Sequence, residues 1–176
     1  AAINQNAGDD ICGAVGAVGT CEHGAHVASI AAGTNGVAPQ ADIISLQVFH
    51  LRTNPNPIPI GFPPAQLCNN AAPGAQCVLA NQADSLAALN EAALLADNFD
   101  IAAVNMSLGG GTNNAACDGD LRKVAIDNLR SRGIATVVFS GNAGLVNAIG
   151  APACVSTAIS VGSTVDTQLP AADNAT

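Results

Sequence analysis

Four short apolar runs, separated by segments of a different pattern, constrain the fold of this chain most strongly. Each run has between four and seven residues and is mostly apolar along its length, which is typical of a strand buried in a parallel sheet. Helical patterns lie between the runs, so we predict an α/β fold: a doubly wound, mostly parallel sheet with helices on both faces. The predicted strands are residues 43–49, 101–106, 134–139 and 158–161.

The predicted helices lie on both sides of the second strand and near the start of the chain. Residues 82–98 carry apolar residues at spacings of three and four, and so do residues 118–132. The second of these has two aspartates in its first turn, basic residues in its last turn and Gly133 directly after it, as the helix dipole and the usual C-terminal cap favour. An alanine-rich helix is also expected over residues 22–32.

Residues 51–80 interrupt this alternation. The stretch contains five prolines between Asn54 and Pro64, followed by two cysteines, and it is too long for an ordinary connection between a strand and a helix. We interpret residues 51–80 as a surface excursion stapled by a disulfide, with an extended loop of no function as the alternative.

Six dispersed cysteines favour an oxidised, exported protein, because none of them forms a CxxC pair of the zinc-ribbon or thioredoxin type. The pairing is open, but two pairs of cysteines have the same separation of nine residues and would close two short loops. The expected disulfides are Cys12–Cys21, Cys68–Cys77 and, by elimination, Cys117–Cys154.

Charge and composition exclude several classes of partner. Thirteen acidic and five basic residues give a net charge of −8, whereas nucleic-acid binding requires a basic surface. The chain has neither Trp nor Tyr for base stacking, and no apolar run approaches the roughly 20 residues of a membrane span. We therefore expect neither nucleic acid nor a membrane as a partner.

Polar residues and glycines follow two of the predicted strands, at the end where α/β proteins bind their ligands. Residues 105–111 (Asn-Met-Ser-Leu-Gly-Gly-Gly) follow the second strand, and residues 140–144 (Ser-Gly-Asn-Ala-Gly) follow the third. The second segment can also be a simple turn, since Gly-Asn is a common turn dipeptide. Residues 22–28 (Glu-His-Gly-Ala-His-Val-Ala) open the alanine-rich helix with two histidines.

A metal site is one interpretation of the histidine-containing segment. Cys21, His23 and His26 are close in sequence, and two histidines three residues apart share a helix face. A zinc-binding protein is therefore an alternative function. For His26 itself we expect instead the role of a core histidine buried against the sheet.

In their order along the chain, these segments resemble the subtilisin-like serine proteases. The resemblance extends from about Cys21 to Val165 and rests on several short blocks in the family's order and at similar spacings. The cysteine-containing segments at Cys117 and Cys154 are similar to those of a secreted, bacterial branch. The blocks are residues 23–28, 36–39 (Gly-Val-Ala-Pro), 105–110, 140–144, 151–154 (Ala-Pro-Ala-Cys) and 159–162 (Ile-Ser-Val-Gly).

The resemblance implies a role for each matching residue. His23 matches the catalytic histidine, a general base that takes the proton of the nucleophile. Asn142 matches the asparagine of the oxyanion hole, which donates a hydrogen bond to the tetrahedral intermediate. Extended backbone next to the pocket for the substrate side chain would bind peptides by strand addition. The implied substrate-binding residues are Ser107, Leu108, Gly109 and Gly141.

Two members of the family's catalytic triad have no counterpart in this sequence. The catalytic aspartate belongs to an Asp-Thr/Ser-Gly strand, and we do not assign this role to Asp9 or Asp10. The nucleophilic serine belongs to a downstream Gly-Thr-Ser-Met-Ala block, which residues 1–176 do not contain. We expect an interior fragment of a catalytic domain that is inactive alone, because the triad acts as a unit. A catalytically dead, peptide-binding homologue is the alternative.

Smaller departures concern the histidine block and the cofactors. Ala25 stands where the family usually has Thr, and Ser29 where it usually has Gly. The turn at residues 33–36 is shorter than in family members with a tight calcium site, so we expect no cofactor there. A weaker cation site near Ala153 is kept as an alternative that we do not predict. The resemblance further implies peptide or protein substrates, and we expect a secreted monomer.

Overall fold

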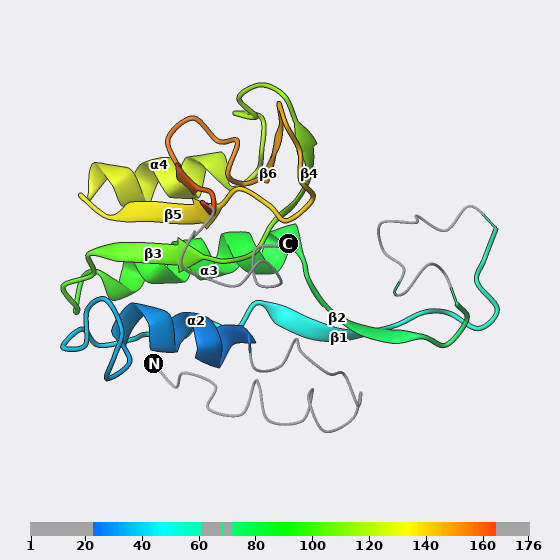
Figure 1. Ribbon diagram of the computed structural model, residues 1–176, viewed down its shortest axis with the longest axis horizontal. Coiled ribbons are helices and arrows are strands. Elements are labelled where there is room, and N and C mark those ends of the chain that lie inside the picture. Colours follow the sequence, from blue (N-terminus) through cyan, green and yellow to red (C-terminus); the bar gives the residue numbers. More distant parts are fainter. Residues whose placement is uncertain (1–22, 61–67, 69–71, 165–176) are drawn as a thin grey trace. The chain divides into compact units, whose positions relative to one another are not determined.

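The computed structural model describes residues 23–60, 68 and 72–164 (Figure 1). The chain divides into two compact units, residues 1–84 and 85–176. The predicted Cys12–Cys21 disulfide lies outside the described residues. Among the described residues, none of the helices is long and apolar enough to cross a membrane.

Helix α2 (His23–Ala32) is present in the first unit, as predicted, and opens its described part. The chain reverses directly after it, and the N–H of Val37 donates to the carbonyl of Ile30 at 2.9 Å. Gly36 is required in this reversal, because a Cβ at that position would lie 2.8 Å from the carbonyl oxygen of Ser29. This close return of the backbone satisfies carbonyl groups in the last turn of α2.

Strands β1 (Phe49–Thr53) and β2 (Gln76–Ala80) form an antiparallel pair in the first unit. The pairing brings together the two ends of the proline-rich segment, and the Cys68–Cys77 disulfide joins that segment to β2. This disulfide is one of the expected pairs, and its presence is confirmed.

Asn54 anchors the connection between β1 and β2. Its side-chain amide donates to the carbonyl oxygens of Cys68 and Ala72 at 2.9 and 2.8 Å, and its Oδ1 accepts from the N–H of Cys68 at 2.7 Å. Asn54 is only 2% exposed. A buried amide is tolerated here because its donors and acceptor all have partners.

The predicted strand over residues 43–49 is wrong for all but its last residue. Residues 43–48 belong to no helix or strand, and Ile43 and Ile44 are exposed. The strand instead begins at Phe49, where the antiparallel partner β2 supplies hydrogen bonds. An apolar run forms a strand only where a neighbouring strand pairs with it.

A parallel sheet forms the centre of the second unit. Strand β5 (Ala135–Phe139) lies between β3 (Ala103–Met106) and β7 (Ile159–Val161). Both pairings are parallel, so the predicted strands over residues 101–106, 134–139 and 158–161 are confirmed within one or two residues at their starts. The α/β class with a parallel sheet is likewise confirmed.

Helices α3 (Gln82–Leu95) and α4 (Lys123–Ser131) contribute much of the core of this unit, and α4 packs on β5 (Figure 1). Arg132 joins the two helices, because its guanidinium donates to the carbonyl of Ala93 and to the carboxylate of Asp97, at 2.7 and 2.8 Å. The buried apolar residues of this core include Leu89, Ala92, Ala93, Met106, Ala125, Ile126, Leu129 and Val138.

The C-terminal end of α4 agrees with the prediction, whereas its start does not. Gly133 has φ of +79° and its N–H donates to the carbonyl of Arg130 at 2.9 Å, so the predicted C-terminal cap is present. The helix begins only at Lys123, however, five residues after the predicted start at Asp118. Asp118 is held by Ser156, so the chain before Lys123 follows that contact and not the helix.

Candidate active site

The two glycine-rich segments leave the same edge of the parallel sheet. Met106 in β3 and Val138 in β5 are paired neighbours, so the residues that follow each strand lie at the carboxyl edge. Ser107, Leu108 and Gly109 follow β3, while Gly141 and Asn142 follow β5. Five of the six residues predicted for the site therefore belong to one edge of one unit.

The backbone of Ser140 fixes the start of the segment that contains Asn142. Its N–H donates to the carbonyl of Val161 at 2.8 Å, and its carbonyl accepts from the N–H of Gly150 at 2.9 Å. Gly141 then adopts φ of +119°, a conformation that favours glycine. Asn142, which follows, is exposed, so its carboxamide is available to donate a hydrogen bond to a ligand.

Strands β4 (Gly110–Asn113) and β6 (Ile149–Ala151) form a two-stranded sheet in the second unit. They pair antiparallel, with Gly110 opposite Ala151. A Cβ at Gly109 would lie 2.6 Å from the carbonyl oxygen of Ala151. The two backbones approach closely here because glycine leaves the space between them free.

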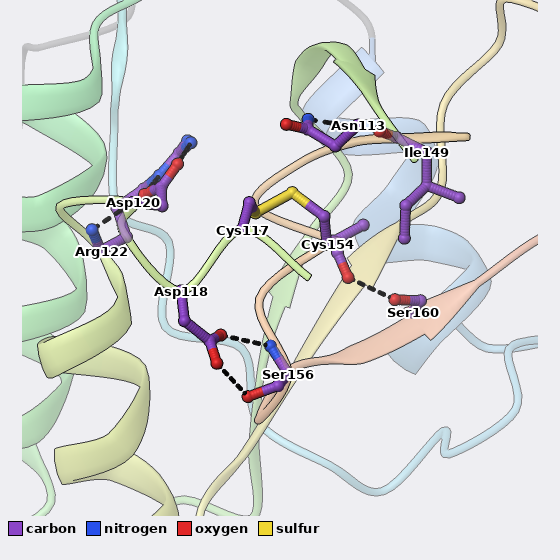
Figure 2. The surroundings of a disulfide bond; sticks show 10 residues. Asn113, Cys117, Asp118, Asp120, Arg122, Ile149, Cys154, Ser156 and Ser160 are labelled. Atoms are coloured by element: carbon purple, nitrogen blue, oxygen red, sulfur yellow. Dashed lines mark hydrogen bonds and ion pairs between the residues drawn. A yellow bond between two sulfur atoms is a disulfide. The ribbon is translucent and has the colours of Figure 1, made fainter. Parts of the chain in front are cut away.

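A disulfide and a carboxylate hold the segment between β6 and β7 (Figure 2). Cys117 and Cys154 are disulfide-bonded, as predicted, and the N–H of Cys117 donates to the carbonyl of Cys154 at 2.9 Å. The next residue, Asp118, accepts hydrogen bonds from the N–H and the hydroxyl of Ser156 at 2.9 and 2.8 Å. The N–H and hydroxyl of Ser156 keep the pKa of Asp118 below its ordinary value.

Two further carboxylates in the second unit, Asp127 and Asp120, also accept hydrogen bonds that lower their pKa. The ammonium group of Lys123 and the hydroxyl of Thr157 bind Asp127 and lower its pKa. The guanidinium of Arg122 binds both oxygens of Asp120 and lowers its pKa. The side chains of Arg122 and Asp120 are each 5% exposed, so the ion pair is largely shielded from solvent. None of these contacts was predicted, since a sequence pattern does not show which group an aspartate contacts in the folded chain.

His23 and His26 belong to α2 in the first unit, and both are exposed. The expectation that His26 is a buried core histidine is therefore wrong, because α2 has no buried residue. Cys21, the third member of the zinc hypothesis, lies outside the described residues, as do Asp9 and Asp10. Within the described part of the chain, no group of three His, Cys, Asp or Glu residues is placed to hold a metal ion.

A shallow surface hollow of about 550 Å³ lies beside this site in the second unit. Its lining consists of residues 113–116, 145–149, 153–156, 158 and 160. Neither Asn142 nor residues 107–109 belong to its lining. The hollow is thus separate from the edge at which the predicted substrate-binding residues lie.

The fold defines an α/β protein with a parallel sheet, and proteins of this class bind their ligands at the carboxyl ends of the strands. The family model described as "Subtilase family" matches residues 16–175, which is most of the 176-residue chain. The chain belongs to the subtilase family of serine proteases, as the resemblance of its motifs implied. Among curated proteins and among solved structures, no match was found.

Proposed function

We propose that this chain carries part of the active site of a secreted serine endopeptidase that cleaves peptide or protein substrates. The observation that carries the proposal is the common edge of Ser107–Gly109 and Asn142 in a chain of the subtilase family. The two disulfides of the described residues support an oxidising, extracellular location. We further propose that the chain is a monomer and needs no cofactor for this role.

Each proposed residue has a defined task. His23 acts as the general base toward a serine hydroxyl and returns the proton to the leaving amine. Asn142 donates a hydrogen bond to the oxyanion of the tetrahedral intermediate; in subtilisin, which gives the family its name, loss of such a donor reduces turnover about 10²–10³-fold. Residues 107–109 pair with the substrate backbone, and Gly141 leaves room beside them.

We also propose that residues 1–176 do not hydrolyse peptides alone. The sequence holds neither an Asp-Thr/Ser-Gly block nor a Gly-Thr-Ser block, and His23 without a nucleophile cannot start acyl transfer. Loss of the serine removes nearly all of the benefit of the other triad members. The alternative is a peptide-binding homologue without catalysis. It would use the same edge of the sheet, but the product of its complete gene would also lack the nucleophilic serine.

The test uses a fluorophosphonate probe, which reacts with activated serines. The 176-residue chain should remain unlabelled, whereas the product of the complete gene that encodes it should be labelled and should cleave casein. His23→Ala in that product should abolish both signals, and His26→Ala, a change of the neighbouring exposed histidine, should leave them. A complete gene product that stays unlabelled but binds peptides would identify the non-catalytic homologue.

A further inference from the structure

We propose that Asn35 is a site of self-modification: its carboxamide reacts with the backbone nitrogen of Gly36, and the isoaspartate that results weakens the C-terminal end of helix α2. This inference goes beyond the proposed function, because it needs neither a substrate nor any member of a catalytic triad. The reaction takes place within the chain, and water is its only co-reactant.

Asparagine or aspartate followed by glycine occurs twice in the sequence, at Asn35–Gly36 and at Asp118–Gly119. Glycine has no Cβ, so it hinders least the approach of its own backbone nitrogen to the preceding side chain. The two pairs differ in what holds that side chain. Both carboxylate oxygens of Asp118 accept hydrogen bonds from Ser156. Asn35, by contrast, is exposed, and no described residue forms a hydrogen bond with its carboxamide.

Asn35 and Gly36 lie in the turn that follows α2. The N–H of Gly36 donates to the carbonyl of Gly33 at 2.7 Å, which closes a turn over residues 33–36. This bond must open before the nitrogen can attack, and exposed turns are among the parts of a protein that open most easily. A Cβ at Gly36 would lie 2.8 Å from the carbonyl oxygen of Ser29. The fold therefore requires glycine directly after Asn35.

The reaction forms a ring and then opens it. The nitrogen of Gly36 bonds to Cγ of Asn35, its proton passes to the side-chain nitrogen, and the bond from Cγ to that nitrogen breaks, so ammonia leaves a cyclic succinimide. Water then adds to one of the two ring carbonyls and returns a proton to the nitrogen of Gly36. Cleavage of the bond from this nitrogen to Cγ gives aspartate, whereas cleavage of its bond to the backbone carbonyl carbon gives isoaspartate.

The isoaspartate product alters the backbone that caps α2. The N–H of Val37 donates to the carbonyl of Ile30 at 2.9 Å. The N–H of Ala38 donates to the carbonyl of Ala31 at 2.8 Å. Isoaspartate inserts one more carbon atom into the main chain directly before Gly36, which moves both N–H groups out of register with these carbonyls. Carbonyls in the last turn of α2 then lose their partners.

Charge acts in the same direction. Both products carry a carboxylate in place of the neutral carboxamide of Asn35. This carboxylate follows shortly after Ala32, the last residue of α2, where the helix dipole is negative and disfavours an anion. Aspartate therefore weakens α2 by charge alone, whereas isoaspartate weakens it by charge and by backbone length.

The first experiment ages the purified 176-residue chain in a mildly alkaline buffer, which favours loss of the Gly36 amide proton. Peptide mapping by mass spectrometry follows the gain of about 1 Da that marks conversion of an amide into an acid. A protein isoaspartate methyltransferase labels the isoaspartate product. Asn114 is the internal control, because it is also exposed but is followed by Ala115. Asn35 should gain mass and label while Asn114 stays unmodified.

Hydrogen exchange then measures the effect on α2. The amides of Val37 and Ala38 should be protected in the fresh chain and should lose this protection in the purified isoaspartate form. Asn35→Asp introduces the charge without the extra backbone atom, so it should keep more of the protection. Asn35→Gln has a longer side chain that closes the corresponding ring far more slowly. It should stay unmodified and keep the protection of the fresh chain throughout ageing.

If Asn35 is modified no faster than Asn114, the inference is overturned. An isoaspartate form that keeps its protection at Val37 and Ala38 would overturn the weakening of α2. Neither result bears on the proposed function, because the fluorophosphonate probe and peptide cleavage test that function separately.

Discussion

The two units each contain a disulfide reinforced by a polar side chain, but the two polar anchors differ in charge and burial. In the first unit the anchor is the buried, neutral amide of Asn54 beside the Cys68–Cys77 disulfide. In the second unit it is the exposed carboxylate of Asp118 beside the Cys117–Cys154 disulfide. The neutral amide of Asn54 stabilises the fold through hydrogen bonds that do not change with pH. The carboxylate of Asp118 can be protonated, so its contribution to stability depends on pH.

The largest expected difference between the two regions concerns their disulfides. The cysteines are 37 residues apart in the Cys117–Cys154 pair and 9 residues apart in the Cys68–Cys77 pair. Replacing both cysteines by alanine should cost about 4 kcal/mol for the longer loop and about 2.5 kcal/mol for the shorter one, because the longer crosslink restricts the unfolded chain more. Urea unfolding followed by circular dichroism measures both values, and a larger loss from the shorter loop would contradict this ranking.

The neutral anchor should be nearly as important as its disulfide. Asn54→Ala leaves the N–H and the carbonyl of Cys68 and the carbonyl of Ala72 without their partner, which should cost about 2–3 kcal/mol in the unfolding free energy. Asn35→Ala changes an exposed asparagine of the same unit and should be close to neutral. Similar losses in the two variants would show that burial of Asn54 contributes nothing.

Two adjacent glycines test the close approach of β4 and β6 in the second unit. Gly109→Ala places a methyl group 2.6 Å from the carbonyl of Ala151, so it should destabilise the unit by about 2 kcal/mol, the usual cost of overpacking. Gly110→Ala is the matched control, because a Cβ there meets nothing within 4 Å. Hydrogen exchange of the β6 amides measures both effects, and equal effects would argue against the close contact of Gly109 with Ala151.

The smallest effect should be the pH dependence of the charged anchor. The folded pKa of Asp118 is lowered by the N–H and hydroxyl of Ser156. Its contribution is therefore complete above the ordinary aspartate pKa of about 3.9 and is lost as the pH falls through the lower, folded value. Asp118→Asn should be less stable than the wild type at pH 6, and the difference should shrink toward pH 2. A difference that grows on acidification would have the wrong sign.

Local patterns predicted most elements of the second unit. The strand at residues 134–139 and the Gly133 cap are determined by apolar and glycine residues adjacent in sequence, and the structure contains both. The strand over residues 43–49 was predicted incorrectly because an apolar run does not reveal its pairing partner. The late start of α4 was also missed, since the partner of Asp118 is Ser156, 38 residues further along the chain.

The candidate site was only partly accessible to sequence reasoning. The motifs around Ser107 and Asn142 identified the carboxyl edge, because a parallel sheet brings the ends of neighbouring strands together. The close approach of Gly109 to Ala151 could not be predicted in this way. It accompanies the pairing of β4 with β6, which the sequence of residues 149–151 does not reveal.

The central proposal, which still needs a direct test, is that His23 and Asn142 serve one peptide-cleaving site. A crystal structure of the chain measures the separation of the His23 imidazole and the Asn142 carboxamide directly. The proposal predicts that both groups face the same cleft beside residues 107–109. Placement of the two groups on opposite sides of the molecule would contradict the claim.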